Sequence, residues 1–122
     1  MNEAAWDGTE IAAAARRLAV YGTLAPGRAN AHVLEPLGGR WFDGTVRGRR
    51  INAGWGDTYG YPGLQLDPDG DEIAVQVLEA AGLPERFAEL DAFEGAEYER
   101  VIAEVRTPAC TLLANVYVIR AT

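Results

Sequence analysis

The carboxyl group of Glu94 is the strongest candidate for chemistry in this sequence. The run from Pro84 to Glu94 favours a helix, because proline suits a first helical turn and Gly95 suits a left-handed stop. At about 3.6 residues per turn, Glu94 falls on the same stripe as Phe87 and Leu90, which should face the core. Burial, the helix dipole and neighbouring acids would each raise its pKa, as a general acid/base working near neutrality requires.

The alternative for Glu94 is an ordinary solvated helix end. Helix termini fray, and a rotation by one residue would turn this side chain toward water. Glu85 and Glu89 lie on the opposite side of the helical wheel and are predicted to be exposed. The helical period by itself leaves both interpretations of Glu94 open.

A second candidate is the tetrapeptide Tyr21-Gly22-Thr23-Leu24, which follows a predicted strand. Where a strand ends in such a turn, successive backbone N–H groups can converge on a carboxylate or an oxyanion. Glycine after a strand is also the usual way to turn a chain. The tetrapeptide alone therefore favours a plain turn and leaves an anion site as the alternative.

Several kinds of catalytic site are excluded by what the chain lacks. There is no serine and no lysine, so a Ser-His-Asp triad, a Schiff-base lysine and a complete phosphate-binding loop are all ruled out. Cys110 is the only cysteine and His32 the only histidine, and both are predicted to be surface or turn residues. The acidic run from Asp67 to Glu72 lacks the spacing of a calcium loop. No metal site is predicted.

Composition limits the class of protein further. The 122 residues are 48% hydrophobic and 24% charged, which is typical of one globular domain. A net charge of −7 disfavours nucleic acid, whose binders need a basic face. No apolar stretch approaches the roughly 18 residues that a membrane helix needs. The single cysteine suits a reducing compartment, so a cytoplasmic protein that binds neither nucleic acid nor membrane is expected.

Short strands and turn signals follow one another along the chain, with one clear helix late in the order. Residues 1–17 are predicted to be a disordered or weakly helical tail, and residues 18–122 one domain. A short helix at most is expected over 29–34, and Trp41, Trp55, Tyr59 and Tyr61 are expected to line the core or a cavity. Strands are predicted at 18–21, 40–51, 64–66, 73–78, 98–106 and 112–120. The fold class is α+β: a small mixed or antiparallel β-barrel with one or two packed helices.

Taken in order, these motifs resemble those of the gamma-glutamylcyclotransferase-like (AIG2-like) family. The resemblance extends from Leu18 to Arg120. Its residues are Tyr21-Gly22-Thr23-Leu24, Gly27, Asn30, Tyr61-Pro62-Gly63, Leu90-Asp91-Ala92-Phe93-Glu94-Gly95, Tyr98, Arg100 and Val116-Tyr117-Val118. The combination of the opening tetrapeptide with the Asp-x-x-Glu-Gly block is more specific than either alone.

The resemblance implies a barrel with helices and the release of 5-oxoproline from a γ-glutamyl amine or peptide, without a metal or organic cofactor. It makes Glu94 the general acid/base. It also makes the tetrapeptide the loop that binds the glutamyl group. Tyr98, Arg100 and Tyr117 match positions that shape the substrate cavity.

This chemistry fits the missing nucleophiles, because the substrate's own α-amine attacks its γ-carbonyl. The identity of the leaving amine stays open, and so does whether the Gly22 loop holds the oxyanion or the substrate's α-carboxylate. A monomer or weak homodimer is expected. The alternative from another class is a non-catalytic small-molecule-binding or regulatory protein on the same barrel.

Overall fold

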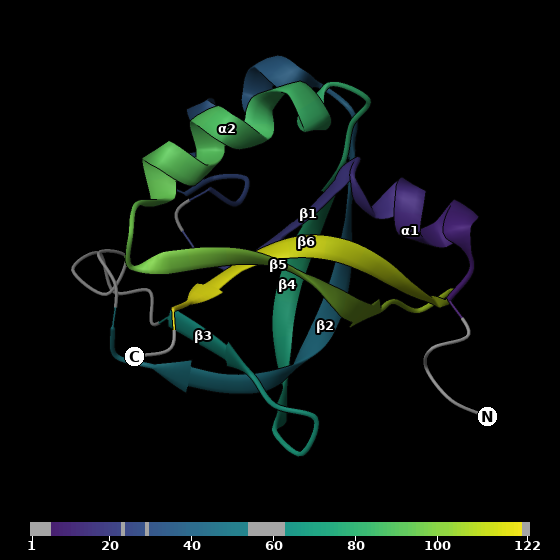
Figure 1. The fold of residues 1–122 in the computed structure, drawn as a ribbon, viewed down its shortest axis with the longest axis vertical. Helices are drawn as coiled ribbons and strands as arrows, with labels where there is room; N and C mark the ends of the chain where they lie inside the picture. Colours follow the sequence, from purple (N-terminus) through teal and green to yellow (C-terminus); the bar gives the residue numbers. More distant parts are fainter. Residues whose placement is uncertain (1–5, 23, 29, 54–62, 121–122) are drawn as a thin grey trace.

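Five strands of this protein close a mixed β-barrel, and a sixth extends it at one side. The computed structural model describes residues 6–22, 24–28, 30–53 and 63–120. The strands are β1 (Arg17–Val20), β2 (Arg40–Ile51), β3 (Gly63–Leu66), β4 (Asp71–Glu79), β5 (Tyr98–Arg106) and β6 (Thr111–Ile119). Each lies within two residues of its predicted bounds. The predicted α+β barrel is thereby confirmed (Figure 1).

The order of the strands is β3-β2-β4-β1-β6-β5, and a pairing of β2 with β5 at Thr45 and Arg106 closes the barrel. β1 lies between β4, to which it is antiparallel, and β6, to which it is parallel. The other pairings are antiparallel. The end of β1 and the end of β6 therefore lie at the same side of the barrel, which brings the Tyr21 junction close to Tyr117.

Two buried clusters fill the protein, because alternate residues of a strand face opposite sides of the sheet. The inner cluster fills the barrel with residues such as Val46, Val77 and Val116. The outer cluster lies between the barrel and helix α2 (Leu83–Glu94) and includes Leu78 and Tyr117. β6 contributes to both clusters, so its outward side chains meet α2.

The segment after β1 contains two short 3-10 helices, η2 (Ala31–Val33) and η3 (Glu35–Leu37), where a short helix was expected. The helix at α2 has its predicted extent, and Gly95 follows with a φ of 90°, a conformation that favours glycine. Trp41 was expected in the core or a cavity wall, which is wrong, because it is 36% exposed. It lies on the outward side of β2. Trp55, Tyr59 and Tyr61 lie outside the described residues.

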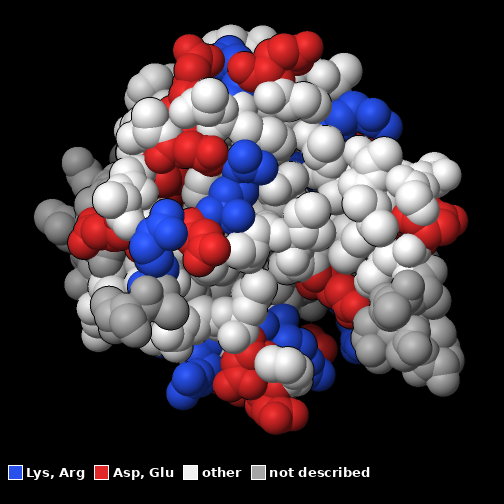
Figure 2. Space-filling model, in the orientation of Figure 1, with Lys and Arg blue, Asp and Glu red and all other residues white. Residues whose placement is uncertain are grey.

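Acidic and basic side chains are interspersed on the face of the molecule that Figure 2 shows. Several pair with each other, among them Arg47 with Glu72 and Arg86 with Glu89. Asp67 to Gly70 forms the predicted turn, in which the Gly70 N–H donates to the Asp67 carbonyl at 2.9 Å. No helix in the described part of the chain is long and apolar enough to cross a membrane.

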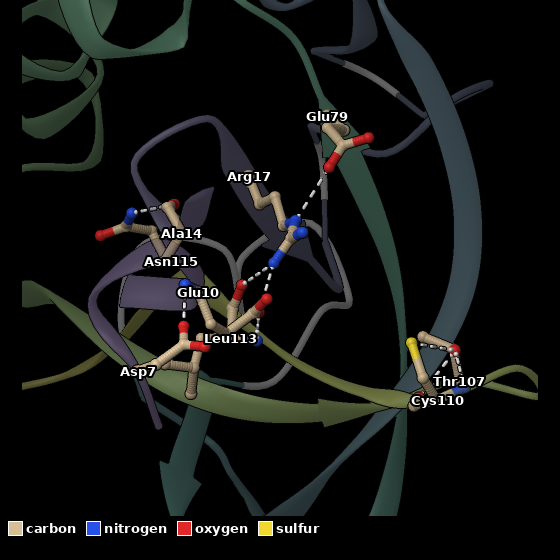
Figure 3. A network of polar contacts seen from close by, with 9 residues as sticks. All are labelled: Asp7, Glu10, Ala14, Arg17, Glu79, Thr107, Cys110, Leu113 and Asn115. Atoms are coloured by element: carbon tan, nitrogen blue, oxygen red, sulfur yellow. Dashed lines mark hydrogen bonds and ion pairs between the residues drawn. The ribbon is translucent and has the colours of Figure 1, made fainter. Parts of the chain in front are cut away.

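The segment before β1 was expected to be disordered or weakly helical, and it instead contains a helix, α1 (Gly8–Ala14), packed on β6. The Asp7 carboxylate caps it by accepting the Glu10 N–H at 2.8 Å. The Glu10 carboxylate accepts the Leu113 N–H of β6 at 2.8 Å and pairs with Arg17 (Figure 3). A helix this short is marginal alone, so these contacts with the barrel account for it.

Candidate functional site

Helix α2 presents Glu94 on its buried side. The residues of α2 that are buried are Leu83, Phe87, Leu90 and Glu94, as the helical period predicts. Only 8% of Glu94 is exposed, so the alternative of a solvated helix end is wrong. Glu85 and Glu89 are exposed, as expected.

Burial raises the pKa of the Glu94 carboxyl to about 7. The sequence suggested that neighbouring acids would add to this shift. The structure instead exposes three of these acids to solvent, Glu89, Glu97 and Glu99, and pairs Asp91 with Arg100. Burial is therefore the cause of the raised pKa of Glu94. A carboxyl with a pKa near 7 is partly ionised at neutral pH and can both accept and return a proton.

The hydroxyl groups of Tyr21 and Tyr117 lie near Glu94, and each already donates a hydrogen bond to another residue. The Tyr21 hydroxyl donates to the Tyr117 carbonyl at 2.7 Å, and the Tyr117 hydroxyl donates to Asp91 Oδ1 at 2.6 Å. Burial raises the pKa of Tyr21, and the charges of Tyr98 and Glu94 raise it further. Burial also raises the pKa of Tyr117, with Asp91 and then Glu94 adding to it. Tyr21 and Tyr117 therefore both lie within electrostatic reach of Glu94.

Asp91 is a residue that the sequence named only as the start of the Asp-x-x-Glu-Gly block, without a role in the site. Its carboxylate accepts two hydrogen bonds from Arg100, Nε to Oδ1 at 2.9 Å and an NH2 group to Oδ2 at 3.3 Å. These bonds to Arg100 hold the pKa of Asp91 below its usual range, although burial opposes them. Its place three residues before Glu94 was a usable signal, because residues at that spacing are neighbours on a helix.

Tyr98, Arg100 and Tyr117, which the resemblance placed at the cavity, line one cleft together with Asp91. The cleft has a volume of about 730 Å³ and lies between the end of α2 and strands β5 and β6. Arg120 also lines it and donates to the carbonyls of Ala96 and Tyr98, both at 3.1 Å. The turn between α2 and β5 is thereby tied to the end of β6.

The junction after β1 packs against the same helix. Leu24 and Ala25 belong to the buried cluster that contains Phe87 and Leu90. The Ala25 N–H donates to the Gly22 carbonyl at 3.1 Å, which makes a tight turn. Thr23 lies outside the described residues, so the anion-binding amides expected of this loop stay a prediction.

Cys110 and His32, for which the sequence predicted no role in chemistry, are both exposed. Cys110 is exposed in the β5–β6 turn, where its backbone N–H donates to the Thr107 hydroxyl at 3.1 Å (Figure 3). His32 is exposed on η2. Within the described residues, no group of three or more His, Cys, Asp or Glu side chains could hold a metal ion.

The raised pKa of Glu94 predicts a pH-dependent gain of stability in the Glu94→Gln variant. The unfolded chain loses this proton near pH 4.5 and the folded chain only near pH 7, so ionisation destabilises the folded protein above that window. Glutamine stays neutral. We expect the variant to be more stable than wild type at pH 8, by up to about 3 kcal/mol, with the difference shrinking toward pH 5. Urea unfolding at both pH values measures this.

The control for this prediction is Glu89→Gln, which removes an exposed carboxyl from the same helix. Its stability difference from wild type should change little between pH 5 and pH 8. A Glu94→Gln variant that is equally destabilised at both pH values would contradict the prediction.

A model of the family described as gamma-glutamyl cyclotransferase, AIG2-like, matches residues 18–122 of the chain. This match covers most of the sequence and supports an enzyme of the cyclotransferase type in general. No curated protein matches the chain at a significant level.

Solved structures with the same fold come from bacteria, animals and archaea. YkqA from Bacillus subtilis is 25% identical with a TM-score of 0.68, and the match covers 88% of this chain but only 36% of YkqA. An AIG2-like protein from Mus musculus is 24% identical with a TM-score of 0.67, over 88% of this chain and 78% of that one. An uncharacterized protein from Pyrococcus horikoshii is 22% identical with a TM-score of 0.58, over 87% and 79%. The last two likenesses show the fold alone.

Proposed function

This chain belongs to the gamma-glutamyl cyclotransferase, AIG2-like family, and from that membership we propose that it releases 5-oxoproline from a γ-glutamyl amine or peptide. Glu94 is the general acid/base of the reaction. The observation that carries the proposal is a carboxyl that is buried on α2 and has a pKa of about 7. Such a group is suited to moving a proton in both directions at neutral pH.

In the reaction, the α-nitrogen of the substrate attacks its own γ-carbonyl carbon. A bond forms between these two atoms, and the bond from the γ-carbon to the leaving nitrogen breaks. Glu94 accepts a proton from the attacking amine and returns one to the leaving nitrogen, so the products are 5-oxoproline and the free amine. The nucleophile comes from the substrate, which agrees with a chain that has no serine and no lysine.

Two physical effects supply the acceleration. Holding the two reacting atoms of one molecule at attack distance lowers the barrier by roughly 7–11 kcal/mol in favourable cases. A positioned acid/base contributes about 10²–10⁴-fold more. The protein therefore needs to fold the substrate and move protons, and in this proposal Glu94 moves them.

The junction Tyr21, Gly22, Thr23 and Leu24 holds the glutamyl part of the substrate in this proposal. Support comes from the packing of Leu24 in the same cluster as α2 and from the closeness of Tyr21 to Glu94. Because the Tyr21 hydroxyl donates to the Tyr117 carbonyl, its oxygen is left to accept a hydrogen bond. Tyr98, Arg100 and Tyr117 form the wall on the side of β5 and β6.

The test is to incubate the protein with γ-glutamyl amines and γ-glutamyl dipeptides that differ in the leaving amine, and to measure 5-oxoproline. Product above the uncatalysed rate with at least one of them is expected. No product from any compound, with binding still detectable by calorimetry, would contradict the proposal and favour a non-catalytic binding protein. The compound with the highest kcat/KM identifies the preferred leaving amine.

A further inference from the structure

The Asp91 carboxylate is the polar link between the last turn of α2 and two strands of the barrel. It accepts the Tyr117 hydroxyl of β6 at 2.6 Å. It also accepts two hydrogen bonds from Arg100 of β5, at 2.9 and 3.3 Å. Two-point contact with a guanidinium fixes orientation as well as distance. Three bonds from two strands therefore converge on one side chain of α2.

Arg100 is itself held from three directions. Besides Asp91, its guanidinium donates to Asn115 Oδ1 at 3.0 Å and lies 4.1 Å from the centroid of the Phe87 ring. Asn115 is buried and donates in turn to the Ala14 carbonyl at the end of α1, at 2.8 Å. These contacts hold the Arg100 side chain in one position in the wall of the cleft.

The apolar stripe of α2 decides which side of the helix faces the barrel, because Leu83, Phe87 and Leu90 are almost completely buried in the outer cluster. Arg86 and Glu89 pair within the helix. The bonds of Asp91 to Arg100 and Tyr117 add a directional polar attachment at the last turn, where Glu94 lies.

The exact rotation of the last turn of α2 sets where the Glu94 carboxyl lies, because successive residues are about 100° apart around a helix. Asp91 lies one helical turn before Glu94, so bonds that fix Asp91 also fix the angle at which Glu94 projects. We propose that Asp91, held by Arg100 and Tyr117, is the positioning residue that keeps Glu94 directed inward at the reacting atoms.

This inference rests on the proposed function for its meaning in catalysis, but its geometry can be tested without turnover. Tyr21 after β1 and Tyr117 on β6 lie within electrostatic reach of Glu94, and Tyr98 on β5 lies within reach of Tyr21. Asp91 lies one turn before Glu94 on α2 and is paired with Arg100 of β5. The phenols stay neutral in the range of interest. Asp91 and Arg100 are the charged pair, and they largely cancel each other.

The experiment compares Asp91→Asn, Arg100→Gln, the double variant and Asp91→Glu. Each single neutralisation is expected to lower kcat by about 10- to 100-fold while KM changes less than about threefold. A displacement of reacting groups by about 1 Å is enough to cause a rate loss of that size. The double variant should be no slower than the slower single variant, because both changes remove one interaction. Glu89→Gln, which breaks the exposed pair with Arg86 on the same helix, is the matched control and should keep wild-type kcat.

The pKa of Glu94, measured by carboxyl ¹³C NMR in the substrate-free protein, separates positioning from the simple loss of a charge. Burial is what raises this pKa, so a Glu94 that turns toward solvent should titrate lower. If Asp91 and Arg100 hold Glu94 inward, the pKa should fall in Asp91→Asn, in Arg100→Gln and in the double variant alike. Asp91→Glu keeps the charge but shifts the carboxylate by one methylene, so kcat and the pKa should both fall, though by less.

Wild-type kcat in both Asp91→Asn and Arg100→Gln would overturn the inference. So would pKa changes of Glu94 in opposite directions in the two variants, because an unpaired anion or cation nearby gives that result without any movement of Glu94. If the wild-type protein turned over no γ-glutamyl compound, the proposed function would fail, and the NMR titration would still decide whether Asp91 and Arg100 position Glu94.

Discussion

Replacing Glu94 with glutamine is expected to lower kcat for 5-oxoproline release by about 100- to 10,000-fold, the usual contribution of a positioned acid/base. Glutamine has nearly the same size and can fill the same buried space, but it cannot accept the proton of the attacking amine. KM should change little, because the rest of the binding surface is intact. The measurement is the rate of 5-oxoproline formation at saturating substrate.

A loss of activity counts only if the variant is folded. Because Glu94→Gln removes a carboxyl whose ionisation is unfavourable in the folded state, it should unfold at a urea concentration no lower than wild type at pH 8. Glu89→Gln, exposed on the opposite side of α2, should keep wild-type kcat. Equal turnover by wild type and Glu94→Gln would remove Glu94 from the mechanism.

The pH dependence is the second large effect. The proposed reaction needs the ionised form of Glu94 to accept the first proton, and its pKa is about 7 because the side chain is buried. Below that pH, activity should fall by about tenfold per unit, and at pH 5 only about 1% of Glu94 is ionised. An exposed glutamate would keep its charge down to about pH 4.5 and would show no such loss.

The substrate's α-amine also titrates, at about pH 8 or slightly below in model peptides. The fall of activity at low pH could therefore come from this amine or from Glu94, and a measurement has to distinguish the two. The midpoint of this fall in a kcat profile should match the pKa of Glu94 read by NMR in the wild type, and should move downward with that pKa in Asp91→Asn and in Arg100→Gln. Activity that is unchanged between pH 8 and pH 5 would contradict the assignment of Glu94 as the base.

Local pattern in the sequence accounts for α2 and for the inward side of Glu94. A helix repeats its faces every few residues, so Phe87, Leu90 and Glu94 had to share a side once the helix formed, and Gly95 had to end it. Alternation and turn residues likewise placed the strands to within two residues. These features depend on neighbours in the chain, which is why the sequence contains them.

Other features depend on residues that are far apart in the chain. The helix α1 exists because Glu10 meets Leu113 and Arg17, contacts that no pattern within residues 1–17 announces. The sequence placed Asp91 in a motif with Glu94 but gave it no partner and no role. Only the placement of β5 and β6 beside α2 turns it into the partner of Arg100 and Tyr117.

The sequence by itself thus determined the strands, helix α2, the side of that helix on which Glu94 lies and, through its motifs, the resemblance to the family. The tertiary structure decided that Asp91 pairs with Arg100 and that the hydroxyls of Tyr21 and Tyr117 donate to other residues. It also decided that the junction after β1 packs against α2. The physical reason is range: helix and strand periodicity act over a few residues, whereas hydrogen bonds and burial join whatever the strand order brings together.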